Sequence, residues 1–531
     1  MNRRNFLKIS ALACVAVVAA ACTPTATPTT ATAVPGATAA ATAVPKATAA
    51  ATAAPKVVVT VKSLNIAIQG WMVDTLYKPV VEAINKKLAD DGTNIQWQPQ
   101  VIGDWATYAQ KAPLMFAAGE DFDWCFDAQW QHMMEYMSNN YLAPLEDLLA
   151  QYAPNVRKVV GDRIYQSNFM NGHLYGVPCG DGSTEVAGRG MLVREDLRLK
   201  YGIPEPTKYE DLEPFLAAIK QNEPDLVPLG GPGDYGLINT DYALENDTLY
   251  VGSNGDPGMI VNAFKGMDVS NQFDSDEYRW GCDLAFKWQQ AGYLPKDRMP
   301  ADYTMEANKI AAVVTNGPFT SCTQYTKALQ QYVKDGMIRG FPAKPGFFAG
   351  KLKLSANFVV WNFQCFNKAS KRLAEAATFF NWLYADPANS ELLTKGIVGK
   401  HWIDTGPGFY DMPEGVDPTT NYSYPWYLAG TAVQLERDLV GTFEEDIKYR
   451  KFLTNPANYT PSPLIGFTFD PTSIKSTLAK ETAVVQEYTF ALANGNMDPK
   501  TAIPELAAKL KEAGLEQELT EKNKQVKAYV G

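Results

Sequence analysis

Aromatic rings stand beside polar side chains at two points where apolar runs of the sequence end. Gly70-Trp71 follows one such run, and Asp127-Ala128-Gln129-Trp130 follows another. An indole face stacks well on the apolar face of a sugar ring, while carboxylate and amide groups such as those of Asp127 and Gln129 bond to hydroxyls. For one tryptophan taken alone, core packing over a sheet end is the simpler interpretation. The set as a whole favours contact with a polyhydroxylated ligand.

Histidine-based catalysis finds little support in the sequence. The chain has only three histidines, and it shows no G-x-S-x-G, H-E-x-x-H or phosphate-binding loop. A glycoside hydrolase would need two carboxylates roughly 5 to 10 Å apart across one bond. Asp121, Asp123, Asp127 and Glu185 offer carboxylates for such a pair, but no catalytic motif accompanies them. We therefore expect no catalytic residue and keep a lipid-anchored hydrolase as the weaker alternative.

Cysteine and acidic spacing give no sign of a metal site or cofactor. The cysteines after residue 56 form no C-x-x-C pair, and no D-x-D-x-D-G calcium loop occurs. The run Asp274-Ser275-Asp276-Glu277 is better explained as a solvated turn or helix cap. We expect buried, reduced thiols, with one disulfide as the alternative. These cysteines are Cys125, Cys179, Cys282, Cys322 and Cys365.

The first 22 residues have the features of an export signal. Arg3 and Arg4 precede an apolar stretch that is too short to span a bilayer and ends in small residues before Cys22. This pattern predicts cleavage and lipidation at Cys22. The paired arginines resemble a twin-arginine signal, with general secretory export as the alternative. Residues 23–56 consist almost entirely of Thr, Ala, Pro and Val, which predicts an extended tether.

Length and net charge limit which kinds of partner the exported chain can bind. About 475 residues follow the tether, enough for two or three domains. Loss of Arg3, Arg4 and Lys8 with the signal changes the formal net charge from −10 to −13. An acidic chain of this kind argues against nucleic acid and anionic lipid as binding partners.

Hydrophobic periodicity predicts the elements that would position the first candidate residues. Residues 64–68 and 95–101 alternate as strands do, and residues 122–126 form a short apolar strand. Between them, Asp74 and Asp104 are expected to cap two amphipathic helices, the second of which contains Pro113. This β-α-β-α-β order indicates a parallel sheet with helices on its faces. Ligands bind outside the carboxyl ends of such strands, where Trp71 and Trp130 are expected.

Several longer motifs resemble the extracellular solute-binding proteins of the maltose-binding type, and in particular a lipoprotein subgroup of oligosaccharide binders. Asn171-Gly-His-Leu-Tyr-Gly-Val-Pro178 is similar to a signature of that family, and Tyr141 to Leu149 matches another segment. The resemblance extends over nearly all of residues 60–528. Further matching segments are residues 111–123, 191–202, 287–295, 375–387, 396–402 and 462–471.

The resemblance implies an α/β fold of the two-lobe, type II periplasmic-binding-protein class, with hinge-linked lobes and a ligand cleft. It implies capture of an oligosaccharide and delivery to the permease of an ABC importer by a monomer without catalysis. A peptide or another solute is the alternative ligand. The expected parts are a first lobe over 57–185 completed by part of 305–365, a second lobe over 186–304 completed by C-terminal helices, and a helical region over 366–531.

Position and chemistry within that implied fold add further candidate ligand contacts. Tyr175 is expected near the cleft, and Glu185 and Arg189 flank a glycine-rich stretch before a crossing strand. The returning segments contribute an amide and three more rings. The full set of expected ligand contacts is Trp71, Asp127, Gln129, Trp130, Tyr175, Glu185, Arg189, Asn357, Trp361, Trp402 and Trp426.

Overall fold

The computed structural model describes residues 57–531 with internal gaps, and these residues form one compact unit. The gaps are residues 130, 180–188, 231–248, 250, 253–254, 262, 264–265, 298, 301, 317–321, 343–351, 354–359, 361, 417–420, 423–436 and 461.

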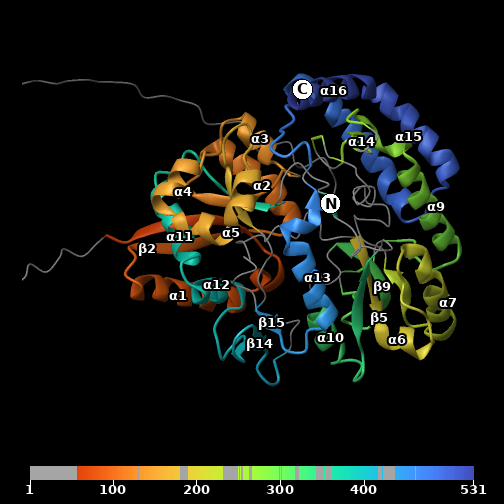
Figure 1. Cartoon of the computed structure of the whole chain (residues 1–531), viewed down its shortest axis with the longest axis horizontal. Helices are drawn as coiled ribbons and strands as arrows, with labels where there is room; N and C mark the ends of the chain where they lie inside the picture. The colour runs from red at the N-terminus through yellow and green to blue at the C-terminus, as the bar shows by residue number, and fades with distance from the viewer. Residues whose placement is uncertain are drawn as a thin grey trace, which may run out of the picture. The chain divides into compact units, whose positions relative to one another are not determined.

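The first sheet has five strands in the order β2-β1-β3-β12-β4 (Figure 1). β1 runs parallel to both β2 and β3, which confirms the parallel arrangement expected from the sequence. β12 comes from much later in the chain and lies antiparallel between β3 and β4. The strands are β1 (Val59–Ile66), β2 (Ile95–Gly103), β3 (Trp124–Asp127), β4 (Gly176–Cys179) and β12 (Asn362–Phe366).

The first two helices follow from their apolar spacing. α1 (Asp74–Asp90) buries Val80, Ile84 and Leu88, which recur every four residues on one face. The expected cap at Asp74 is wrong by one residue, because Val73 holds the cap position and the Asp74 carboxylate instead accepts from Lys78 Nζ at 2.5 Å. α2 (Trp105–Ala118) starts as expected, since Asp104 accepts a bond from the Thr107 backbone N–H at 2.9 Å.

Further helices complete the core of the first sheet. α11 buries Phe379 and Phe380 in this core, where their rings contact that of Trp124. The residues after position 366 therefore contribute to the first core as well as to the C-terminal region. The helices are α3 (Met133–Ser138), α4 (Glu146–Tyr152), α5 (Pro154–Ser167), α11 (Leu373–Leu383) and α12 (Pro387–Thr394), with the short 3-10 helix η1 (Gln69–Met72).

The second sheet has four strands in the order β10-β5-β9-β6. β6 and β9 are parallel, and the other pairs are antiparallel. Of the strands between residues 305 and 366, β9 and β10 pair in the second sheet, whereas β12 pairs in the first. The strands are β5 (Arg189–Arg194), β6 (Val227–Gly230), β9 (Ile310–Asn316) and β10 (Ile338–Pro342).

The C-terminal helices complete the core of the second sheet. Val485 and Leu492 of α14 and Ile503, Leu506 and Leu510 of α15 are buried in one cluster with residues of β5 and α7. Figure 1 shows α14, α15 and α16 together on that part of the molecule. The helices are α6 (Glu195–Lys200), α7 (Glu213–Asn222), α9 (Asp276–Gln290), α10 (Cys322–Leu329), α14 (Lys475–Ala493), α15 (Pro499–Ala513) and α16 (Leu515–Val530).

Smaller elements lie outside the two main sheets. A three-stranded sheet has the order β13-β14-β15, and two ribbons pair β7 with β8 and β11 with β16. α13 contributes Tyr449 to the first core. The bounds are β7 (Gly258–Met259), β8 (Ser270–Asn271), β11 (Leu352–Lys353), β13 (Ile403–Asp404), β14 (Phe409–Asp411), β15 (Asp438–Leu439), β16 (Tyr459–Thr460), α13 (Glu444–Thr454), η3 (Tyr209–Leu212), η4 (Gln272–Asp274), η7 (Pro456–Asn458) and η8 (Thr472–Ile474).

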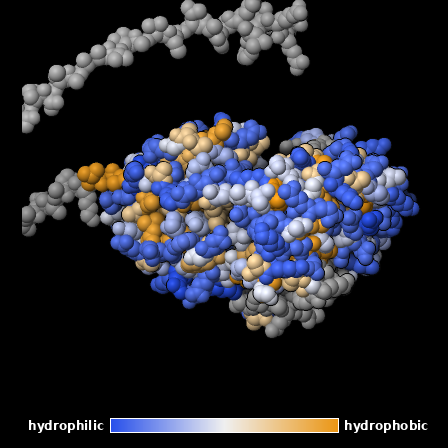
Figure 2. Space-filling view, turned by 90° about the horizontal axis from the view of Figure 1, so that it is seen from above, coloured by the Kyte–Doolittle hydropathy of each residue, from blue (hydrophilic) through white to orange (hydrophobic). Residues whose placement is uncertain are grey.

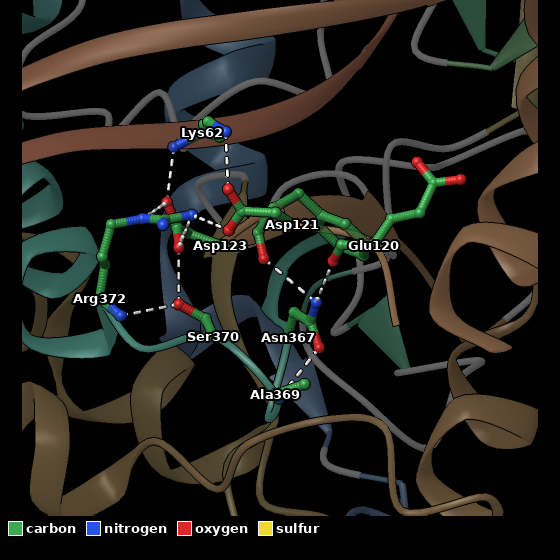
Figure 3. Close-up of polar contacts among 9 residues, drawn as sticks. Lys62, Glu120, Asp121, Asp123, Asn367, Ala369, Ser370 and Arg372 are labelled. Atoms are coloured by element: carbon green, nitrogen blue, oxygen red, sulfur yellow. Dashed lines mark hydrogen bonds and ion pairs between the residues drawn. The ribbon is translucent and has the colours of Figure 1, made fainter. Parts of the chain in front are cut away.

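A polar network fixes the start of β3 (Figure 3). Asp123 has no exposed side-chain surface, and its carboxylate accepts bonds from the Lys62 backbone N–H at 2.6 Å and the Ser370 hydroxyl at 2.6 Å. Arg372 bonds to Asp123 and also to Asp121, which pairs with Lys62 Nζ. A buried carboxylate needs such partners to offset its lost hydration. The network therefore anchors the entry to β3 at the strand end opposite Asp127.

The face shown in Figure 2 is largely hydrophilic, with apolar side chains scattered over it. Across the described part of the chain, every helix is too short or too polar to cross a bilayer. Within the same residues, no three His, Cys, Asp or Glu side chains gather in a way that could hold a metal ion.

Candidate functional site

Asp127 ends β3 and organises the loop that follows it. Its side chain is fully buried. One oxygen, Oδ1, accepts bonds from the backbone N–H groups of Ala128 at 2.7 Å and His132 at 2.9 Å. These two bonds bring the backbone at Ala128 and at His132 to one carboxylate oxygen, directly before α3 begins. The second oxygen, Oδ2, takes no part in this turn.

Several polar atoms around this loop are buried without hydrogen-bond partners among the described residues. They include Asp127 Oδ2 and His132 Nδ1. His132 Nδ1 lies 3.5 Å from Asp127 Oδ2, which is too long for a good hydrogen bond. A buried polar atom without a partner costs about 1–3 kcal/mol. The loop is therefore chemically suited to exchange hydrogen bonds with a polar molecule.

Strand register adds Asn362 to this group. Phe363 of β12 pairs with Asp127, and the antiparallel direction then places Asn362 beside Ala128. Asn362 also pairs with Cys179, the last residue of β4. Its Oδ1 is buried and likewise has no partner among the residues the structure describes. The ends of β3 and β4 and the start of β12 thus share one edge of the sheet, where carboxylate, amide and imidazole groups gather.

Aromatic packing supports the loop from below. The His132 ring stacks on Tyr136, with ring centroids 5.7 Å apart and an interplanar angle of 29°. Burial, together with the nearby Asp127, raises the pKa of Tyr136 well above its ordinary value, so this phenol stays neutral. Tyr108 donates from its hydroxyl to the Phe126 carbonyl at 2.7 Å. These contacts fix the rings of Tyr108 and Tyr136 beside the end of β3 and the loop that follows it.

Trp71 occupies a core position in the structure. Only 1% of it is exposed, and its ring stacks on Tyr77 at 4.7 Å with an interplanar angle of 13°. Its indole N–H faces the Tyr422 hydroxyl at 3.4 Å. In this structure Trp71 therefore packs in the core over the sheet end, which is the alternative that the sequence left open.

Trp402 and Tyr175 also differ from the positions expected of them. Trp402 is 6% exposed, donates to the Gly396 carbonyl at 2.9 Å and lies under the Arg437 guanidinium at 5.5 Å, so it stabilises a turn. Tyr175 precedes β4, which places it at the opposite end of that strand from Cys179. It is half-buried, its ring meets that of His173 at 5.9 Å, and burial raises its pKa.

The remaining expected contacts divide into two groups. Gln129 is half-buried and lies in the loop between Asp127 and Gln131, as expected from the sequence. The others fall outside the described residues, including the side chain of Arg189. They are Trp130, Glu185, Arg189, Asn357, Trp361 and Trp426, together with the lipidation candidate Cys22.

The ligand contacts expected from the sequence did not include Gln131, His132 or Asn362. The first two stand in the same post-strand segment as Asp127 and Gln129, so their position was a usable signal. Asn362 gave no local signal, because only the pairing of β12 with β3 brings it to this edge.

Three of the four carboxylates considered for a hydrolytic pair lie at the two ends of β3, and the fourth, Glu185, is outside the described residues. Asp121 and Asp123 stand before β3, and Asp127 stands at its end. Asp121 and Asp123 are engaged by Lys62 and Arg372, as ion pairs or through the backbone. This arrangement opposes their use with Asp127 as a catalytic pair across one bond.

All five cysteines of the described chain are buried and free, as expected for reduced core thiols. Burial raises the pKa of Cys179 and of Cys282 to about 12, which makes both poor nucleophiles at neutral pH.

Comparisons with known proteins agree with this architecture. Residues 69–390 match the model of the family described as bacterial extracellular solute-binding protein, and residues 463–531 match a domain of unknown function, DUF3502. A relative from Streptococcus pneumoniae serotype 4, a carbohydrate ABC transporter substrate-binding protein, is 25% identical over 452 residues, covering 84% of this chain and 86% of its own. A fructooligosaccharide ABC transporter substrate-binding protein, FusA, from the same organism is 25% identical over 221 residues, covering 38% of this chain and 40% of its own.

Solved structures share the fold. The N-glycan transport solute-binding protein NgtS from Streptococcus pneumoniae, in complex with Man1GlcNAc, aligns with a TM-score of 0.70 at 23% identity, covering 89% of this chain and 99% of that one. The alginate-binding protein AlgQ2, crystallised without calcium ion, aligns with a TM-score of 0.62 at 17% identity, covering 89% of this chain and 98% of that one.

Proposed function

This chain belongs to the bacterial extracellular solute-binding proteins, and we propose that it captures an oligosaccharide and delivers it to the permease of an ABC importer. The observation that carries this proposal is the match to a carbohydrate ABC transporter substrate-binding protein over 84% of the chain. The relatives are substrate-binding proteins and not enzymes, and family membership implies export.

The polar edge of the first sheet supports a sugar as the ligand. Asp127 Oδ2 is an acceptor held in place by the bonds to Oδ1, and the Asn362 amide stands at the same edge of the sheet with its Oδ1 unpartnered among the described residues. A sugar hydroxyl donates and accepts at once, so it can satisfy a carboxylate and an amide together. A peptide carboxylate would face the charge of Asp127. We assign Asp127, Gln129, Gln131, His132 and Asn362 to this part of the ligand site.

The N-terminal segment provides the proposed attachment to the membrane. Lipid on the sulfur of Cys22 would hold the protein at the membrane, and residues 23–56 would act as its tether. A monomer on such a tether can meet its permease repeatedly without diffusing away.

The experiment is a thermal-shift and calorimetric screen of the purified chain against neutral glycans, including mannose–N-acetylglucosamine oligosaccharides, and against peptides. A ligand that binds only the folded state adds about 2.7 kcal/mol of stability at one hundred times its Kd. A shift with one glycan class and no product supports the proposal. A shift with peptides alone overturns the ligand class, and release of a cleaved glycan overturns the receptor function.

A further inference from the structure

The C-terminal segment and residues 249–271 build a small core of their own. Asn523 of α16 holds this segment at Val269, accepting from its N–H at 2.9 Å and donating to its carbonyl at 3.0 Å. The C-terminal residues from 463 on are therefore hydrogen-bonded directly to the described residues of 249–271. The buried apolar residues of this core are Leu249, Val251, Ile260, Val269, Leu464, Phe467, Phe469, Ile474 and Val526.

A fully buried lysine forms the polar centre of this contact. Lys522 Nζ lies 2.7 Å from Glu518 Oε1, 2.9 Å from Asp256 Oδ2 and 3.0 Å from the Gly258 carbonyl. These three acceptors match the three N–H groups of an ammonium. Gly258 in turn donates its N–H to Glu518 Oε1 at 3.2 Å. The lysine and Glu518 thus bind the turn at Asp256 and Gly258 to α16.

Glu481 of α14 adds a third carboxylate to this one ammonium. Its side chain has no exposed surface, and neither of its oxygens has a hydrogen-bond partner among the described residues. Glu518 Oε2 is buried and unpartnered in the same way. The charged groups that face Glu481 are Glu518 and Lys522 on α16 and Asp256 before β7. If all three carboxylates were ionised, the cluster would hold two uncompensated negative charges inside the protein.

We propose that Glu481 holds a proton in this cluster beside Glu518 and Lys522, and that this proton controls how firmly the described residues of 249–271 are attached to the C-terminal helices. The proton removes one of the buried negative charges that Lys522 does not compensate. The proposal gives the C-terminal region a role as a proton-dependent clamp. It does not depend on the ligand of the protein.

The direction of the pH dependence follows from the pKa of Glu481. Burial, with Glu518 and Asp256 nearby, raises this pKa from 4.5 to about 8, and it also raises the pKa of Glu518. The attached form therefore binds the proton more tightly than a detached form with exposed carboxylates. Attachment is strongest below about pH 4.5 and weakens as the pH rises to about 8. Above about pH 8 its free energy no longer changes with pH.

Hydrogen exchange of the full chain at pH 5.5 and pH 7.5 tests the clamp. The reporters are the backbone amides of Leu249, Gly258, Ile260 and Val269, all of which are hydrogen-bonded. After correction for intrinsic exchange, their protection is expected to fall by up to about tenfold per pH unit in the wild type. In Glu481→Gln, whose amide keeps the shape of the neutral acid, this fall is expected to disappear.

Two further variants separate the proton from the packing. Glu516→Gln changes an exposed carboxylate on α16, the helix that carries Glu518 and Lys522, and should follow the wild type at both pH values. Asn523→Ala removes the bonds to Val269 and should lower protection by a similar factor at both pH values, leaving the pH dependence in place. Equal protection of the wild type at both pH values would overturn the proposal, as would a Glu481→Gln variant that follows the wild type.

Discussion

The Asp123 carboxylate receives the Arg372 guanidinium at 3.1 Å and 3.0 Å, although 249 residues separate the two in sequence. This ion pair joins the entry of β3 to the turn before α11 and so connects early and late parts of the first core.

Asp123→Ala is expected to lower the free energy of unfolding by about 3 kcal/mol, because Ser370, Arg372 and the Lys62 backbone N–H all lose a buried partner. Asp121→Ala is the control. Its side chain is 60% exposed, so the loss there should be about 1 kcal/mol or less. Urea unfolding of both variants measures the difference, and equal losses would contradict the structural role of Asp123.

Gly396→Ala is expected to destabilise the chain strongly. Gly396 has φ +80°, and an added Cβ would overlap His401 Nδ1 and approach Tyr422 to 2.9 Å. Gly399→Ala is a matched control with φ +78° and nothing within 4 Å of the added Cβ. It should cost only the backbone strain, about 1–2 kcal/mol. Melting temperatures report the gap between the two variants, which the overlap predicts to be several degrees.

Acid should weaken the fold through His401. Burial lowers its pKa from 6.5 to about 4, and its Nδ1 accepts the Ile397 N–H at 3.0 Å, which requires the neutral ring. The unfolded chain therefore binds this proton more readily, so the stabilisation is complete above about pH 6.5 and is lost as the pH falls through about 4. The stability of the wild type between these values should fall more steeply than that of His401→Asn. Parallel pH profiles would rule out this assignment.

Gln131→Ala is expected to weaken glycan binding by about tenfold, because its amide stands in the loop after Asp127 that we assign to the ligand site, and to leave the melting temperature nearly unchanged. Gln166→Ala, an exposed position on α5, should change neither quantity. Calorimetric titration of the glycan identified in the screen provides the measurement. Unaltered affinity in Gln131→Ala would remove this residue from the ligand site.

Trp71→Phe should show the opposite behaviour. Loss of part of a ring packed between Tyr77 and Trp97 should lower stability by about 1–3 kcal/mol with little change in affinity. The same titration and unfolding assays decide the matter. A large loss of affinity at unchanged stability would return Trp71 to the list of ligand contacts.

Local patterns were enough to predict the first half of the first sheet. The four-residue spacing of Val80, Ile84 and Leu88 and the cap at Asp104 depend on neighbouring residues only. The antiparallel insertion of β12 could not be predicted in this way, because its pairing with β3 joins residues more than 200 positions apart. The family resemblance supplied the two-lobe fold that local patterns could not.

The candidate site was predictable in part for the same physical reason. Asp127 and Gln129 follow a strand end, which is a local feature, and both lie in the loop as expected. An apolar ring such as Trp71 suits a core and a sugar equally well, so its sequence context does not decide between them. His132 and Asn362 stand out only because packing leaves a polar atom of each without a hydrogen-bond partner among the described residues.

The completion of the second core by α14 and α15 has a consequence for biosynthesis. Strand β5 is synthesised early, whereas the apolar residues of α14 and α15 that share its core come much later in the chain. The second core therefore cannot close before α14 and α15 have been synthesised, and a nascent chain that lacks these helices exposes apolar surface that favours aggregation. Removal of α14 and α15 would accordingly cost the second sheet its own core and not merely an appendage.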